Sequence, residues 1–251
     1  TLQENMLMFK AYGVQMLFEQ GYNSPSSEMQ PLRAYLLSKW AWDPSLESTA
    51  LIENFTNYFY GPAGAIVREV LQTQVKELQM SGKALTLYEP PITHIGGYLN
   101  PASLKWALQM YDQAKKLPGM TNAQIERIEM AAQSIRYALL EIGKSPLAGP
   151  DWYFNDNQAF YQKMLRDFVW TANNNGPKLL HETRLSPNDY HESTLQFWKE
   201  AQVQHLAKGQ QIRYIHLPSP NYKDGLTPFD TTSWIKTSTL NDGLRSTQEY
   251  Q

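Results

Sequence analysis

The sequence predicts a mainly α fold: the terminal β/α unit of a TIM-type barrel, an antiparallel helical bundle and an extended tail. Three observations predict it. A short apolar run between glycines, Val14–Phe18, is typical of a buried strand. Apolar residues with helical spacing recur from Ser27 to Ala201. From Gly209 onward, the composition shifts to proline, asparagine, glycine and threonine.

Residues 1–82 are expected to form the C-terminal end of the barrel with flanking helices. A helix over residues 2–12 precedes the strand Val14–Phe18. A loop rich in asparagine, serine and proline follows, and Ser27 is a candidate N-cap for a helix that extends to Trp42.

Two more helices are predicted before the first domain ends. Asp43–Pro44 is a capping pattern for the first of them. Gly61–Pro62 separates it from the second, and Gly82 ends that helix.

Residues 83–208 are expected to form the helical bundle domain. The bundle begins with a long ordered loop, which runs to Tyr98 and contains two prolines and two glycines. Caps and apolar spacing predict the starts of its helices. They lie at Asn100–Pro101, at Thr121, near Asp156 and at Ser186–Pro187, and the helix from Thr121 has regularly spaced apolar residues from Ile125 to Ile142.

The charge balance excludes some classes of partner. The 251 residues carry a formal net charge of -2, with positive and negative side chains interspersed. Neither nucleic acid nor an anionic membrane surface is therefore an expected partner, and no apolar run is long enough for a membrane span. The first residues lack a secretion-signal pattern, so we expect a removed signal or an internal piece of a larger protein.

The chain lacks the residue patterns of most catalytic centres. It has no cysteine, no phosphate-binding glycine loop and no nucleophile elbow. Its five histidines show no metal-ligand spacing, so we expect neither a metal nor another cofactor. His94 lies in the long loop beside Glu89 and Tyr98. It is either an ordinary loop histidine or a contact for a ligand.

Glu19 follows the predicted strand at the end where barrel enzymes place their chemistry. Glycoside hydrolysis usually needs two carboxyl groups, and this strand supplies one. Glu19 can bind a sugar hydroxyl or orient a water, or it can form an ion pair with Arg33 or Lys39. Glu28 is expected to lie at a helix N-terminus. Other acidic residues are expected on solvated helix faces: Glu126, Glu129 and Glu141.

Aromatic residues make up 12% of the chain. They can pack between helices, or their flat rings can stack on the apolar face of a sugar. Composition alone does not choose between these two roles.

Several of these segments resemble one family. They are Gly13–Gly21, the Ser24–Pro25 loop, Leu32–Lys39, Trp42–Pro44 and Asn57–Ala63. Together they resemble the end of a glycoside-hydrolase-like barrel family, catalogued as domain of unknown function 4838. That family is similar to the family 67 α-glucuronidases and the family 20 hexosaminidases.

The resemblance implies that Val14–Phe18 is the eighth barrel strand and Ser27–Trp42 the eighth helix. It places Phe18 and Glu19 where hexosaminidases carry a Trp-x-Glu that helps to hold the sugar, with Phe in place of Trp. It also places the catalytic acids on earlier strands, and it implies a secreted, periplasmic or cell-surface bacterial protein. In the tail, residues 209–251, Leu240–Ser246 resembles the opening of a discoidin-like β domain.

The resemblance therefore predicts the C-terminal portion of a secreted glycoside hydrolase-like protein, inactive in isolation. Its partners would be carbohydrate and the remainder of the barrel. A non-catalytic helical module that binds glycan or a protein is the alternative, and a pure scaffold is a third. No catalytic residue is predicted, and the substrate-binding candidates are Glu19, Phe18, Tyr22, Tyr88 and His94.

Overall fold

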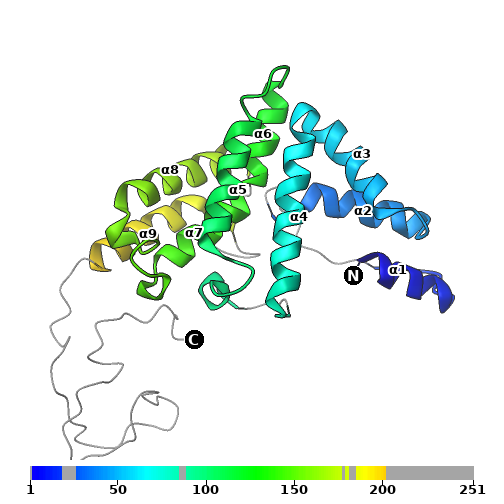
Figure 1. The fold of residues 1–251 in the computed structure, drawn as a ribbon, viewed down its shortest axis with the longest axis horizontal. Helices are drawn as coiled ribbons and strands as arrows, with labels where there is room; N and C mark the ends of the chain where they lie inside the picture. The colour runs from blue at the N-terminus through cyan, green and yellow to red at the C-terminus, as the bar shows by residue number, and fades with distance from the viewer. Residues whose placement is uncertain (1, 19–26, 85–88, 177–178, 181–184, 202–251) are drawn as a thin grey trace, which may run out of the picture.

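The chain is mainly helical, as predicted. The computed structural model describes residues 2–18, 27–84, 89–176, 179–180 and 185–201, and every regular element within these ranges is a helix (Figure 1). The α-helices are α1 Leu2–Ala11, α2 Gln30–Trp42, α3 Ser48–Tyr60, α4 Gly64–Ser81, α5 Pro101–Ala114, α6 Asn122–Ala131, α7 Gln133–Gly143, α8 Gln158–Asn175 and α9 Pro187–Ala201. Short 3-10 helices are η1 Gly61–Ala63, η2 Pro91–His94, η3 Pro146–Ala148 and η4 Phe154–Asp156.

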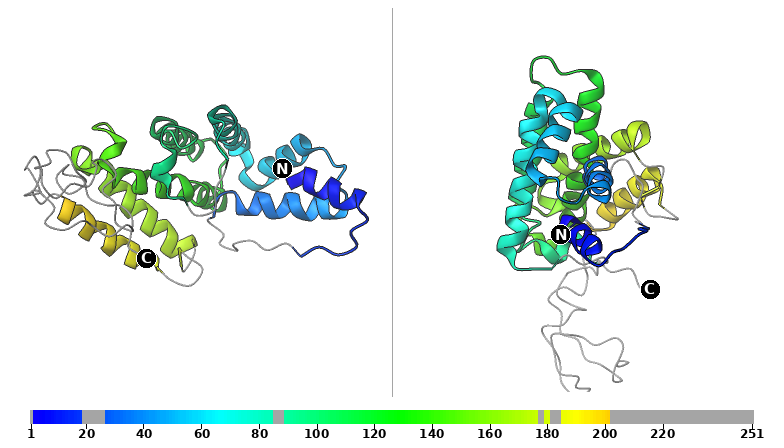
Figure 2. Two further views of the ribbon diagram at one scale, coloured as in Figure 1. Left: turned by 90° about the horizontal axis from the view of Figure 1, so that it is seen from below. Right: turned by 90° about the vertical axis from the view of Figure 1, so that its right-hand side faces the viewer.

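The helices follow one another along the long axis of the molecule in chain order. Helices α1 to α3 lie at one end, α4 to α6 in the middle and α7 to α9 at the other end (Figure 2). Helix α7 packs against both α5 and α8, and α3 packs against α4 and α6. This arrangement gives one continuous buried core that extends from Met6 on α1 to Trp198 on α9.

The segment Val14–Phe18 is not a strand in the described structure. It has no regular structure, and its large apolar side chains are exposed, with Met16 and Phe18 each at 88%. A β-strand needs a neighbouring strand for its backbone hydrogen bonds, and the described residues provide none. The extended tail that the sequence predicts from residue 209 onward lies outside the described residues.

Three of the predicted helix starts are confirmed by their caps. The side chain of Asn100 accepts hydrogen bonds from the backbone of Ala102 and Ser103, at 2.9 and 3.4 Å. Thr121 forms a complete capping box with Gln124. Each cap depends on residues two or three positions away, which is why the sequence alone reveals it. The hydroxyl of Ser186 likewise accepts from the backbone of α9.

Two other predicted starts are wrong. Met29 caps α2 in a left-handed conformation with φ 47°, while Ser27 stays one turn outside the helix. Asp43 ends α2 and binds Ser45, and α3 begins after Glu47, whose carboxylate accepts from two backbone amides. Glu47 therefore replaces Asp43 as the cap.

The predicted helix through Ile125 and Ile142 is interrupted at Ala132, which divides it into α6 and α7. The side chain of Gln133, directly after the break, donates to the carbonyl oxygen of Phe168 at 2.9 Å. The break therefore coincides with the contact that fastens α7 to α8. Among the described residues, no helix combines the length and apolarity that crossing a membrane requires.

Candidate functional site

The sequence-predicted sugar contacts fall on two loops. Glu19 and Tyr22 on the first loop and Tyr88 on the second lie outside the described residues. Phe18 is described and its ring is 88% exposed, so it is open to a ligand or to another part of a protein. The roles of these four residues stay predictions.

His94 is buried at the end of η2, only 5% exposed. Its Nε2 atom lies 2.8 Å from Oε2 of Glu89, and its ring packs on Tyr98 with the ring centroids 4.7 Å apart. These contacts fix the loop that carries the three residues. The predicted closeness of His94, Glu89 and Tyr98 is therefore present, and the imidazole itself faces the protein interior.

Glu28 lies directly before the cap of α2. Its negative charge adds to burial and to the charge of Glu89 in raising the pKa of the Tyr98 hydroxyl. It also contributes, after burial, to the raised pKa of Tyr111 on α5. Glu28 therefore lies close enough to act electrostatically on the loop that carries Tyr98 and on α5.

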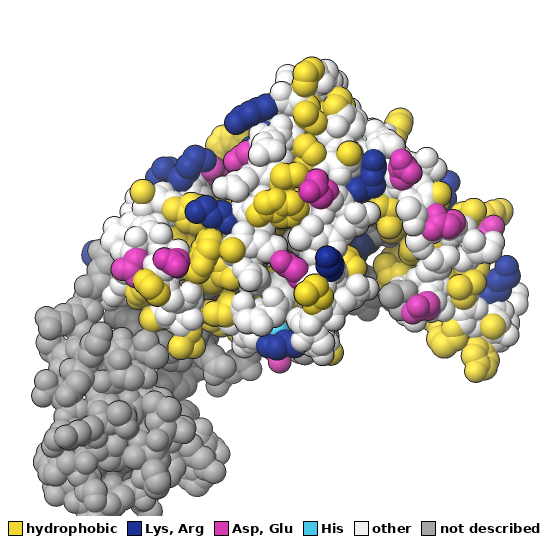
Figure 3. Space-filling view, in the orientation of Figure 1, with side chains coloured by type: hydrophobic (Ala, Val, Ile, Leu, Met, Phe, Trp, Pro, Cys, Tyr) yellow, Lys and Arg dark blue, Asp and Glu magenta, His cyan; other side chains and the backbone are white. Residues whose placement is uncertain are grey.

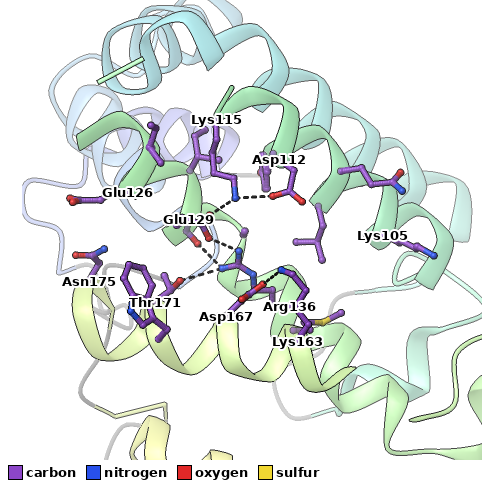
Figure 4. A pocket seen from close by; sticks show the side chains of 18 of the residues that line it. Lys105, Asp112, Lys115, Glu126, Glu129, Arg136, Lys163, Asp167, Thr171 and Asn175 are labelled. Carbon is purple, nitrogen blue, oxygen red and sulfur yellow. Dashed lines mark hydrogen bonds and ion pairs between the residues drawn. The ribbon is translucent and has the colours of Figure 1, made fainter. Parts of the chain in front are cut away.

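A separate cleft of about 600 Å³ lies between α5, α6 and α8 (Figure 4). Helices α5 and α8 each line it with a positive and a negative side chain, whereas α6 contributes two carboxylates, Glu126 and Glu129. Arg136 from α7 reaches into the middle of the group, between Glu129 and Thr171. A volume of this size is typical of small-molecule sites.

The charged side chains in the cleft are linked by a network of ion pairs. Arg136, which is 6% exposed, pairs with Glu129 and donates to Gln133 at 2.9 Å. Lys115 bridges Glu129 and Asp112, with 2.7 Å to the Asp112 carboxylate. This network fixes donors and acceptors in place before any ligand arrives.

The pKa shifts in this network favour binding over proton transfer. Burial by itself raises the pKa of Glu129, but the positive charges of Arg136 and Lys115 lower that pKa overall. Burial lowers the pKa of Lys115, whereas its hydrogen bonds to Asp112 and Glu129 raise it overall. Glu129 and Lys115 therefore remain charged at neutral pH, and neither is suited to exchange a proton with a substrate.

Two acidic residues that the sequence placed on solvated faces are instead partly buried. Glu129 belongs to the cleft network, and its side chain is 18% exposed. Glu141 accepts from Lys144 and from the Tyr190 hydroxyl, each at 2.6 Å. Both residues lie at the edge of an apolar stripe, where helical spacing alone does not show which helix will cover them. Glu126 is exposed, as expected.

No sequence motif indicates the cleft itself. Its members Lys105, Arg136 and Trp170 are spread over three helices and belong to no motif. Among the described residues, no group of His, Cys, Asp or Glu could hold a metal ion.

Comparison with known proteins identifies one related family. Searches of curated proteins and of solved structures gave no match. The family match covers α1 to α3 and the first half of α4, so it includes the segments on which the resemblance was based. Residues 1–72 match the model of the family described as Domain of unknown function (DUF4838).

Proposed function

We propose that the chain is the C-terminal portion of a secreted glycoside hydrolase-like protein that acts on polysaccharide or oligosaccharide. In this proposal residues 1–82 complete an α/β barrel and Glu19 borders its sugar site. Residues 83–208 form an antiparallel bundle that supports the barrel. The catalytic acids belong to other strands of that barrel, so the chain alone is inactive.

The exposure of the segment Val14–Phe18 carries this proposal. Four of its five residues are large and apolar, and all four are exposed. An exposed apolar patch marks a surface that another part of a protein covers. A central barrel strand is buried on both faces, which requires this kind of continuous apolar run. Figure 3 shows hydrophobic side chains at the α1 end of the molecule as well as elsewhere on this face.

The ion pairs of the bundle agree with a non-catalytic role for this chain. Glu129 is held in its charged form by Arg136 and Lys115. A glycosidase acid must instead hold a proton near its working pH. Glu129 is therefore not a candidate for the catalytic acid, and the family resemblance is what assigns the catalytic acids to other strands of the barrel.

The test compares the full-length parent protein with this chain on a panel of glycosides. We expect activity from the parent only. Changing Glu19→Gln in the parent should lower activity or sugar affinity at least about tenfold, because a charged hydrogen bond to the sugar is lost. Glu53→Gln, on the exposed face of α3, is the matched control and should change neither.

Two outcomes contradict the proposal. Hydrolysis by the isolated chain would show that it is complete as an enzyme. A Glu19→Gln parent with altered stability but unchanged sugar binding and activity would support a pure scaffold.

A further inference from the structure

The cleft between α5, α6 and α8 is separate from the proposed barrel site. The described residues that line it lie between Lys105 and Asn175, beyond the part of the chain that matches the family. An inference about this cleft therefore does not depend on the proposed function.

The fixed charges of the cleft balance. Among the described residues, four positive and four negative side chains line it: Lys105, Lys115, Arg136, Lys163, Asp112, Glu126, Glu129 and Asp167. Six of them pair within the cleft, including Lys163 and Asp167 at 2.5 Å. The remaining two, Lys105 and Glu126, lie at opposite ends of it (Figure 4). No net charge is therefore concentrated in the cleft, which favours an uncharged polar ligand over a phosphate or a polyanion.

The cleft also offers aromatic surface. Trp170 on α8 lines it and is 61% exposed, so its ring is open to a ligand. Phe160 lines it as well and is half-buried, with Nζ of Lys105 5.4 Å from its ring centroid. A flat exposed ring beside fixed polar groups suits a ligand with one apolar face and a rim of hydroxyls.

The polar groups are preorganised for such a ligand. The Arg136 guanidinium is held by hydrogen bonds to Glu129, Gln133 and Thr171. The side chain therefore loses little conformational entropy when a ligand binds. Carboxylate oxygens can each accept more than one hydrogen bond, so Glu129 and Asp112 can accept from hydroxyls while still paired with Lys115. Charge-assisted hydrogen bonds of this kind are stronger than neutral ones.

We propose that this cleft binds an uncharged oligosaccharide. One sugar ring stacks on Trp170, and the network of Asp112, Lys115, Glu129 and Arg136 hydrogen-bonds the hydroxyl groups. In this proposal the cleft holds a segment of the oligosaccharide and carries out no reaction.

Isothermal titration calorimetry of the whole chain tests this. The probes are cello-, xylo-, manno- and malto-oligosaccharides, with oligogalacturonate as the acidic comparison. At least one neutral series should bind, and raising the salt concentration about tenfold should leave its affinity nearly unchanged, because no net charge is neutralised.

Matched tryptophan variants locate the site. Trp170→Ala should weaken binding at least about tenfold through loss of ring stacking. Trp42→Ala is the control, because Trp42 on α2 is 91% exposed and does not line the cleft. It should bind as the unaltered chain does. Since Trp170 is largely exposed, its variant is expected to fold, and circular dichroism checks this.

Three results would overturn the proposal: no binding of any neutral series, equal effects of the two tryptophan variants, or binding of oligogalacturonate alone with loss on Lys105→Gln. None of them bears on the parent's response to Glu19→Gln, so the two proposals fail separately.

Discussion

Single residues show why the cleft and the partly buried carboxylates could not be predicted from the sequence. Glu129 and Glu141 sit on helices whose apolar spacing is clear, and the spacing identifies the face that is buried. Which residues cover the edge of that face depends on contacts between residues far apart in the sequence. Tyr190 bonds to Glu141 at a separation of 49 residues, and Arg136 bonds to Thr171 at a separation of 35. Of the predicted contacts, the His94 group was foreseeable, because its members are close in sequence.

Arg136 should contribute strongly to stability. Replacing it with methionine keeps much of the apolar stem but leaves Glu129 with Lys115 as its remaining described partner. We expect the free energy of unfolding to fall by about 2–4 kcal/mol in urea titrations. Arg166→Met, at an exposed position on the neighbouring α8, should change it by less than about 0.5 kcal/mol. Equal effects of the two changes would contradict a structural role for the network.

Glu129 should also make stability depend on pH. Its pKa in the folded chain lies below the ordinary value of 4.5, so the unfolded chain takes up a proton first as the pH falls. The stabilisation is therefore fully present above about pH 4.5 and is lost as the pH falls through the folded pKa. The difference in unfolding free energy between the unaltered chain and Glu129→Gln should shrink over that range. A difference that stays constant down to about pH 3 would contradict this prediction.

At the level of elements, a helix start could be predicted from the sequence when the interactions that define it join residues close together in the chain. The caps at Asn100 and Thr121 use neighbours two or three residues away, and both were predicted. The start of α3 was missed because Asp43 is a preferred cap residue and glutamate is not, yet it is the Glu47 carboxylate that accepts from the backbone amides of Thr49 and Ala50. The strand at Val14–Phe18 needs other strands as partners, and no local pattern can supply them.

Close packing between α7 and α8 gives a test at this scale. A methyl group added at Gly143 would lie 2.4 Å from ring atoms of Tyr161, whose hydroxyl is fixed to the carbonyl oxygen of Trp152 at 2.6 Å. Gly143→Ala should therefore lower the unfolding free energy by about 1–3 kcal/mol, although alanine favours a helix. Gly96→Ala, with no atom within 4 Å of the new methyl, should be nearly neutral. Thermal and urea unfolding of both variants measures these changes, and equal stability of the two variants would contradict the prediction.

At the scale of the whole molecule, the surface is uneven. The face in Figure 3 mixes positive and negative side chains, as the net charge suggested. The α1 end differs, because it exposes Leu7, Met8 and Tyr12 in addition to the segment that follows. Mainly helical character was therefore predictable, whereas the order of the helices along one axis required the structure.

This exposed end should make the isolated chain self-associate. Changing Met16 and Phe18 together to serine should reduce concentration-dependent association in analytical ultracentrifugation, because each side chain is 88% exposed and apolar. The unfolding free energy should change by less than about 0.5 kcal/mol. The same double change made at Tyr58 and Met80, which are also exposed but lie on α3 and α4, serves as the control. Equal loss of association in both variants would show that the α1 end is not the contact surface.

Helix α4 has a mechanical consequence. Its 18 residues form one uninterrupted rod about 27 Å long. The family match ends inside it, at residue 72, so the rod is shared by the two parts of the chain and provides no hinge between them. Helix α4 packs on α3 at one side and on α5 at the other. Helix α4 therefore connects the first helices rigidly to α5, the helix that carries Lys105 and Asp112 at the cleft.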